Sequence, residues 1–434
     1  MQPRRFLPVF VLFAINVLNF YDRNAPGALV EPMRKEFHLS DTEIGLLGGV
    51  FIWIYALVGV PLGRVADTWS RKKLLALGVV VWTALTATAG LATTFTLLLL
   101  SRMGVGVGEA VCAPAATSWL GDLFPPDRRS RVLALFMLGV PVGGALGYFF
   151  SGPIAQAFGW RAAMIFAALP AIFLVPLLFL LHEPERGASE TSNSSISRTS
   201  LRDLLSIPTF WWIIASGAFV NFNMYAIGSF LPAFLSRFHK LSLANSGIAT
   251  GITYIVGGVC GGLLAGYLGD RIVHRRVDGR LLIAAGLAAI GAPFAFLGIM
   301  QPAGAIVAAL TCITVAYGAL NTYYGLVYSS IQDIVPPRQR GFAMSIYFMA
   351  MYLCGASFGP LLTGSLSDRF AKQAMTAAAA TKMTEAFKAI GLHQAMLVLP
   401  VLSLLLAAVL YGASRTITRD VQKRESPRTL SASV

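Results

Sequence analysis

Charged side chains are scarce in this sequence. Only 12% of its 434 residues are Asp, Glu, Lys or Arg, whereas a soluble domain carries about 25%. The histidines all fall in loops or at the ends of apolar runs: His38, His182, His239, His274 and His393. The cysteines are dispersed without the spacing of metal ligands or of a disulfide framework: Cys112, Cys260, Cys312 and Cys354. We therefore expect no metal site and no catalytic residues, which leaves a membrane-embedded lipid-modifying enzyme as a remote alternative.

Long apolar runs fill the sequence instead. Hydrophobic residues make up 56% of the chain, and runs near twenty residues recur, each long enough to cross about 30 Å of hydrocarbon as a helix. The runs lie at residues 6–28, 44–66, 74–93, 95–119, 132–155, 162–181, 209–235, 246–268, 281–300, 303–330, 341–366 and 391–413. The sequence thus predicts an all-α membrane protein with twelve transmembrane helices.

Lys and Arg are unevenly shared between the segments that join these runs. The net charge is +14, and most of the 34 Lys and Arg residues fall in segments on the side of the N-terminus when the runs alternate across the membrane. This positive-inside pattern predicts cytoplasmic termini and a multi-pass protein of the plasma membrane, in a bacterium the inner membrane. Because the basic excess faces anionic lipid, we expect the bilayer as a partner and no nucleic acid.

A polar stretch divides the apolar runs six and six. We predict a first bundle at 1–181, a cytoplasmic linker at 182–208, a second bundle at 209–413 and a cytoplasmic tail at 414–434. The halves echo each other: "GRVAD" ends at Asp67 and "GYLGD" at Asp270, at equivalent places. After six spans the chain is back on the side of the membrane where it began, so the two halves have the same orientation and the repeat is parallel. In such a repeat we expect the ligand path to run between the halves.

The stretch "SRMGVGVGEA", residues 101–110, has three glycines at alternate positions. A nucleotide-binding loop needs a preceding strand and a soluble helix, whereas "FTLLLLS" precedes this stretch, so we reject that interpretation. Glycines inside a membrane helix permit close helix contact, or leave room for a substrate. Arg102 and Glu109 lie seven residues apart and therefore share one helical face.

Ionisable groups at membrane depth face a cavity or a partner. At 1.5 Å per residue Asp22 and Arg102 both lie in the outer half of the membrane, so we expect them to pair. Arg23 is rotated by about 100° from Asp22 and is predicted to face the central region. A carboxylate that alternates between paired and protonated states can carry a proton, so Asp22, Arg102 and Glu109 are the predicted coupling residues. The alternative is a permanent salt bridge that fastens the first span to the fourth.

Polar and aromatic residues in two later spans are candidate substrate contacts. The seventh span offers Asn221, Asn223 and Tyr225, and the tenth offers Asn321, Tyr323, Tyr324 and Tyr328. Of the latter, Asn321, Tyr324 and Tyr328 fall on one helical face. Aromatic rings with polar tips suit an amphiphilic ligand, and Arg23 could meet its anionic head. We select Arg23, Asn223, Tyr225, Asn321, Tyr324 and Tyr328 as substrate-binding, with ordinary interhelical hydrogen bonding as the alternative.

The stretch from Gly63 to Lys73, "GRVADTWSRKK", resembles the signature loop of the major facilitator superfamily, and departs from it at Ser70, where the family usually has Gly. "GVPVGGALG" at 139–147 resembles that family's motif in the fifth span. The resemblance implies two six-helix bundles. We predict that Asp67 and Arg71 form a cytoplasmic gate; a solvated basic loop that only sets topology is the alternative.

Within the superfamily, "RMGVGVGEA", "GDLFPPDRRSR", "PVGGALGYFFSG" and "FGWRAAM" are similar to the Spinster group, which is implicated in lysolipid and sphingosine-phosphate export. The resemblance implies a proton-coupled transporter of an amphiphilic, lipid-like substrate that works by alternating access. Asp22, Arg102 and Glu109 match that group's membrane-embedded charged residues. The alternative is a proton-coupled symporter of small organic or sugar acids. We expect a monomer with no cofactor beyond the proton gradient.

Overall fold

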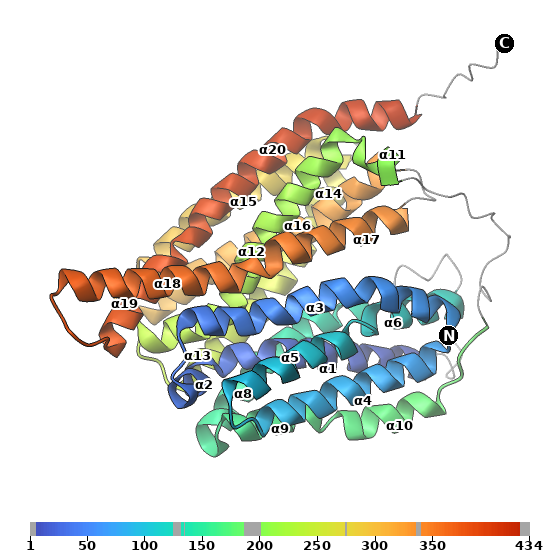
Figure 1. Cartoon of the computed structure of the whole chain (residues 1–434). Coiled ribbons are helices and arrows are strands. Elements are labelled where there is room, and N and C mark those ends of the chain that lie inside the picture. Colours follow the sequence, from blue (N-terminus) through green and yellow to red (C-terminus); the bar gives the residue numbers. More distant parts are fainter. Residues whose placement is uncertain are drawn as a thin grey trace, which may run out of the picture.

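A computed structural model describes residues 6–124, 132–133, 135–185, 201–273, 276–335 and 340–425 (Figure 1). Within these ranges the regular elements are all helical. The first half contains α1 (Phe6–Ala28), α2 (Val30–Phe37), α3 (Asp41–Thr68), α4 (Arg71–Gly90), α5 (Phe95–Glu109), α6 (Cys112–Leu123), α8 (Gly139–Phe158), α9 (Trp160–Ala168) and α10 (Ala171–Leu180).

The second half begins after the predicted linker, whose residues 186–200 lie outside the described ranges. It contains α11 (Leu201–Leu205), α12 (Pro208–Arg237), α13 (Leu243–Ile252), η2 (Thr253–Gly257), α14 (Gly258–Val273), α15 (Gly279–Ile299), α16 (Ile306–Ile334), α17 (Arg340–Met351), η4 (Tyr352–Ala356), α18 (Phe358–Ala377), α19 (Glu385–Met396) and α20 (Val398–Glu425). Helix α20 continues past residue 413, where we predicted the tail to begin; the domain boundaries stay predictions.

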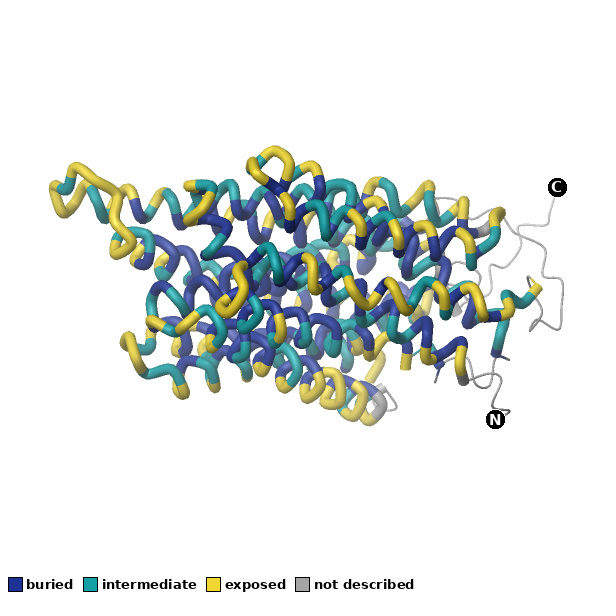
Figure 2. The backbone as a smooth tube through the Cα atoms, turned by 90° about the horizontal axis from the view of Figure 1, so that it is seen from below, coloured by how far each residue is buried: buried dark blue, intermediate teal, exposed yellow. Residues whose placement is uncertain are grey.

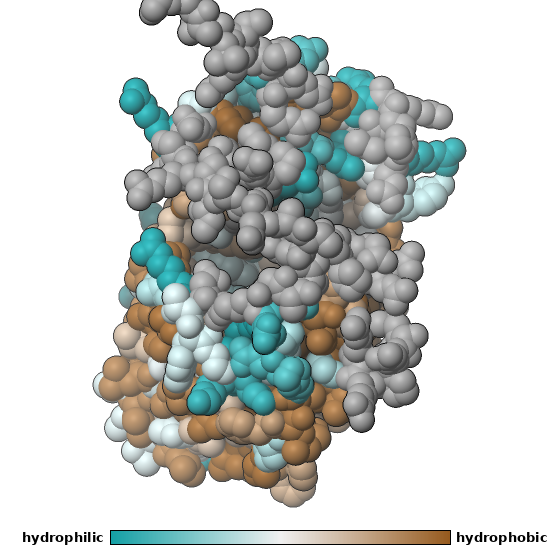
Figure 3. Space-filling model, turned by 90° about the vertical axis from the view of Figure 1, so that its right-hand side faces the viewer, coloured by the Kyte–Doolittle hydropathy of each residue, from teal (hydrophilic) through white to brown (hydrophobic). Residues whose placement is uncertain are grey.

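The helices have the length and surface of membrane spans. Eleven helical stretches of the described chain are long and apolar enough to cross a bilayer, and the 23-residue α1 packs among them as the twelfth. Large side chains such as Phe173, Leu180 and Val307 are 71%, 76% and 80% exposed, which suits contact with lipid and not with water. Buried residues fill the interior (Figure 2), and hydrophilic residues gather on the end that carries the termini (Figure 3). The predicted twelve-helix membrane fold is confirmed.

Each half forms a bundle with its own apolar core. Trp82 and Trp119 lie in the core of the first bundle, and Phe230 and Phe234 lie in the core of the second. The predicted repeat recurs in the contacts: Arg71 at the start of α4 pairs with Asp122 of α6, and Arg280 near the start of α15 pairs with Asp333 of α16.

The bundles touch at the end that contains α2, here called the α2 end, and diverge toward the end that carries the termini (Figure 1). On α3, a Cβ at Gly45 would lie 2.4 Å from the carbonyl oxygen of Pro360 in α18. Gly63 lies eighteen residues, or five turns, further along and so shares the face of Gly45. A Cβ at Gly63 would meet no described atom within 4 Å. The contact between α3 and α18 therefore does not extend to the termini end.

Glu183, just after α10, caps the start of α4. Its carboxylate accepts hydrogen bonds from Ser70 Oγ at 2.6 Å, from Arg71 N at 2.8 Å and from Lys72 N at 3.3 Å. Partial burial disfavours the charged carboxylate, but these hydrogen bonds outweigh it and lower the pKa of Glu183 from its ordinary 4.5. Since the folded-state pKa lies below the unfolded one, the stabilisation is complete above the unfolded pKa and is lost as pH falls through the folded pKa.

We predict that Glu183→Gln lowers the free energy of unfolding of the detergent-solubilised protein by about 1 kcal/mol at neutral pH, as loss of a helix cap does. The difference from the wild type should shrink below pH 4.5, where the carboxylate becomes protonated. Thermal melts across this pH range measure it, with the exposed neighbour Glu185→Gln as the control. Equal melting temperatures for the two variants at neutral pH would contradict the capping role.

Candidate functional site

An arginine–glutamate pair lies inside the first bundle. Arg23 of α1 donates from Nε and Nη2 to Oε2 of Glu109 in α5, at 3.1 and 3.0 Å. The guanidinium also lies over the rings of Phe20, Phe51 and Tyr55, with its Cζ 4.7, 5.3 and 4.4 Å from their centroids. Ionic and cation–π contacts together hold the charge where water is scarce.

The expected pairing of Asp22 with Arg102 is wrong. Arg102 Nη1 reaches only the backbone carbonyl of Asp22, at 3.4 Å, and its guanidinium lies over Phe51. Both carboxylate oxygens of Asp22 are buried without a hydrogen-bond partner among the described residues, and so is Oε1 of Glu109. Arg23 follows Asp22 by one residue and about 100° on α1, and it is this residue that meets the charged face of α5, at Glu109.

The glycines of 101–110 let α5 approach its neighbours, as predicted. A Cβ at Gly106 would lie 2.8 Å from the carbonyl oxygen of Phe51 in α3, and one at Gly108 would lie 2.8 Å from the backbone nitrogen of Trp82 in α4. The helix then ends at Glu109, and α6 begins at Cys112. The paired glutamate is thus held at a break in the fourth span, by close contact on two sides.

Tyrosines of the second bundle face the Arg23 region. Tyr225 of α12 packs against both apolar cores, and its ring centroid lies 6.3 Å from that of Tyr352. On α16, Tyr324 donates to Oδ1 of Asn221 at 3.2 Å and stacks edge-on with Tyr328 at 5.6 Å. These tyrosines are half-buried, and the hydroxyl of Tyr328 lies 3.9 Å from the sulfur of Met351.

Two polar side chains of these helices are engaged within the second bundle. Asn223 is fully buried and donates to Ser403 of α20 at 3.2 Å, so it lies away from the Arg23 region where we expected it to contact substrate. It lies two residues, about 200°, from Tyr225 on the same helix. Asn321 is half-buried and donates to the carbonyl of Gly258 at 2.8 Å.

Sequence reasoning missed Tyr55, Tyr254 and Tyr352. Tyr55 meets Tyr352 across the two bundles at 5.5 Å, and Tyr254 meets Tyr148 across them at 4.9 Å. Tyr254 and Tyr352 lie in η2 and η4, the single π-helical turns of the eighth and eleventh spans. Such turns occur frequently at functional sites, but an apolar run with a regular period gives no sign of them.

Ion pairs join the bundles at the α2 end. Arg237 of α12 donates to Glu31 at 2.5 Å and, through both terminal nitrogens, to Asp41 at 2.7 Å. Arg34 of α2 bonds Glu31 at 3.1 Å and Glu385 of α19 at 2.5 Å. We call these five residues the α2 cluster. Four of them are buried, so separating the bundles here would leave charges without partners.

The structure describes the side chain of one member of the predicted gate pair, Arg71. Arg71 is fully buried and bonds Asp122, Glu183 and the carbonyl of Pro184, all within the first half of the chain. The side chain of Asp67 lies outside the described residues, so its predicted role stays a prediction.

The chain matches known proteins along most of its length. The model of the Major Facilitator Superfamily matches residues 12–360. The chain belongs to the major facilitator superfamily. It is similar to an "MFS-type efflux pump" of Mycolicibacterium smegmatis, with 30% identity covering 96% of this chain and 95% of that protein. It is also similar to protein spinster homolog 1 of Bos taurus, with 32% identity covering 84% and 73% of the two chains.

A solved structure extends this similarity to the fold. A bacterial homolog of the human lysosomal transporter Spinster, in an inward-facing and unoccupied conformation, matches with a TM-score of 0.86 and 28% identity, covering 97% of this chain and 99% of that one. The predicted fold and the Spinster resemblance are confirmed. The superfamily and its fold are those of multi-pass membrane transporters.

The geometry predicts opposite effects for two neutralised carboxylates of this major facilitator protein. Glu109→Gln removes the ionic partner of the buried Arg23 and should lower the free energy of unfolding by about 3 kcal/mol. Asp22→Asn removes a charge that accepts no hydrogen bond and should leave stability unchanged or raise it. Thermal melts of the two variants in one detergent measure this; a larger loss for Asp22→Asn than for Glu109→Gln would contradict the pairing.

A further prediction concerns the α2 cluster. Arg237→Gln leaves Glu31 and Asp41 buried without their main cation. The closed arrangement should lose about 3 kcal/mol of stability, which shifts the population more than tenfold toward separation of the bundles at this end. Spin labels on cysteines replacing the exposed Lys35 and Lys382, one from each bundle, would report a longer distance. The exposed Arg276→Gln is the matched control. An unchanged distance distribution in Arg237→Gln would refute the closing role.

Proposed function

We propose that the protein is a secondary active transporter, coupled to protons, that moves an amphiphilic, lipid-like anion of the lysophospholipid or sphingoid-phosphate type by alternating access. The observation that carries this proposal is the placement of Arg23. Its guanidinium, with a side chain 5% exposed, is bound to Glu109 and surrounded by aromatic rings beside the tyrosines of the opposite bundle. A guanidinium matches the geometry of phosphate, so a substrate head can compete with Glu109 for it.

The competition supplies a route for coupling. When an anionic head takes Arg23, the Glu109 carboxylate loses its main partner in a low-dielectric region and is favoured to bind a proton. Asp22, whose buried carboxylate oxygens accept no hydrogen bond from the described residues, can hold or release the same proton. When the head leaves, Arg23 returns to Glu109 and the proton is released. The membrane potential contributes about 2.3 kcal/mol per charge per 100 mV to such movement.

The surroundings of Arg23 favour an amphiphile over a small hydrophilic acid. Tyr225, Tyr324, Tyr328 and Tyr352 offer aromatic faces for an apolar chain and hydroxyls for its polar end. A small acid with several carboxylates or hydroxyls would need more fixed polar partners than this mostly aromatic region offers.

The arrangement of charge supports an orientation. With the basic termini end in the cytoplasm of a bacterial cell, the α2 cluster closes the outer side and the described conformation is inward-facing. The proposed protein is a monomer in the plasma membrane that binds a small amphiphile, binds no nucleic acid, and needs no cofactor besides the proton gradient.

The test is reconstitution in liposomes with a panel of lysolipids and small organic acids, with and without a proton gradient. Asp22→Asn and Glu109→Gln should each abolish gradient-driven accumulation and spare substrate binding. Asp278→Asn, the same change in an exposed loop pair, is the matched control and should transport as the wild type does.

Accumulation by both variants at the wild-type rate under the gradient would refute the coupling. Accumulation of sugar or organic acids, with no transport of any lysolipid, would establish the alternative substrate class instead.

A further inference from the structure

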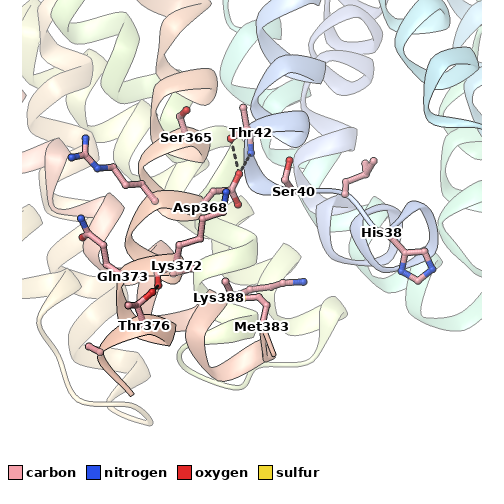
Figure 4. A pocket seen from close by; sticks show the side chains of 14 residues that line it. His38, Ser40, Thr42, Ser365, Asp368, Lys372, Gln373, Thr376, Met383 and Lys388 are labelled. Carbon is pink, nitrogen blue, oxygen red and sulfur yellow. Dashed lines mark hydrogen bonds between the residues drawn. The ribbon is translucent and has the colours of Figure 1, made fainter. Parts of the chain in front are cut away.

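A groove of about 1050 Å³ opens on the α2 end, outside the α2 cluster. One wall comes from the first bundle and includes His38 and Ser40; the other comes from α18, α19 and the loop between them and includes Lys372, Met383 and Lys388 (Figure 4). The transport site between the bundles does not account for this groove.

The groove carries an excess of positive charge. Arg369, Lys372 and Lys388 line it, and Asp368 is the one carboxylate among the described lining residues. That carboxylate is already occupied, because it accepts hydrogen bonds from the backbone nitrogens of Asp41 and Thr42 at 3.0 and 2.8 Å and from the Thr42 hydroxyl at 2.6 Å. It therefore does not neutralise the basic residues.

Two of the cations have no structural role that the contacts reveal. The side chains of Arg369 and Lys372 make no hydrogen bond or ion pair with any other described residue. Lys388 forms an ion pair with Glu385 at 3.4 Å, and Glu385 is also the partner of Arg34. The guanidinium of Arg presents several N–H donors in one plane, and the ammonium of Lys is a compact charge. Together they suit a phosphate head. Leu39, Ala371 and Met383 line the same groove and can cover the first carbons of an attached chain.

The groove exists only while the two bundles are together at this end. Its walls are joined by the bonds between Asp368 and the start of α3, so opening the α2 end would pull them apart. A molecule that binds both walls has a higher affinity for the closed state and shifts the population toward it.

We propose that this groove is a second binding site, for the phosphate head of a single-chain anionic amphiphile, and that its occupation from the outer side holds the α2 end closed. The binding stands by itself. For transport in the outward direction, the consequence is that released product slows its own export, and this consequence rests on the proposed function.

The binding test uses the full-length protein in phosphatidylcholine nanodiscs and hexyl phosphate as the probe, followed by calorimetry. An Arg23→Gln background removes the head contact proposed for the transport site. Substituting both groove cations, Arg369→Gln with Lys372→Gln, should weaken binding by about tenfold or more. Lys382→Gln, a lysine of the same α18–α19 loop that does not line the groove, is the matched control and should bind as the background does.

Two further binding measurements distinguish a free amphiphile from inorganic phosphate and from a lipid headgroup of the bilayer. Inorganic phosphate should bind more weakly than hexyl phosphate; equal binding would overturn the part of the proposal that concerns the chain. Nanodiscs that contain phosphatidylglycerol should bind hexyl phosphate as before; strong competition would identify a bilayer headgroup as the occupant and overturn product feedback. Unchanged affinity in the double variant would overturn the site itself.

A transport test separates this proposal from the proposed function. In liposomes, the double variant in an otherwise wild-type chain should transport lysolipid at the wild-type rate but lose inhibition by hexyl phosphate added on the groove side. Equal inhibition of the wild type and the variant would overturn the feedback. Absence of lysolipid transport in the wild type would refute the proposed function, while the calorimetric result on the groove would still hold.

Discussion

The ion pair between Arg23 and Glu109 is the interaction on which the centre of this protein depends. A charged group buried in an apolar bundle is costly unless it is paired and hydrogen-bonded. Several features satisfy that requirement here: aromatic rings lie under the guanidinium, glycines bring α5 close to α3 and α4, and the fourth span breaks directly after the glutamate. Asp22, next to Arg23 in the chain, has no hydrogen-bond donor among the described residues for either carboxylate oxygen.

The two buried groups of charges differ in which bundles they join. Arg23 and Glu109 both belong to the first bundle, so their pairing can change while the bundles keep their positions. The α2 cluster joins α2 and α3 to α12 and α19, so it must break when that end opens. Because buried pairs are expensive to separate, the α2 cluster stabilises the closed arrangement of this end, whereas the central pair makes no contribution to joining the bundles.

The two halves repeat in architecture but not in chemistry. The pairs Arg71–Asp122 and Arg280–Asp333 occupy equivalent places and tie equivalent helices together. In the central region, by contrast, the first half supplies the ionic pair and the second half supplies neutral tyrosines on α12, α16 and η4. The amphiphile that we propose as substrate would therefore contact both bundles, its charged head the first and its apolar chain the second.

The sequence by itself determined the number and order of the spans, the parallel repeat and the few ionisable residues at membrane depth, because hydrophobic length and charge content are local properties of the chain. Only the tertiary structure decided which of those residues meet. Adjacent residues on a helix differ by about 100°, so the packing of α1, and not its composition, decided that Arg23 pairs with Glu109 and that Asp22 does not pair with Arg102. The same applies to Asn223, which faces α20, and to the π-helical turns that carry Tyr254 and Tyr352. Glu31, Arg34 and Arg237 look like ordinary loop and helix-end charges in the sequence; they form a cluster only because two bundles, distant in the chain, close at one end.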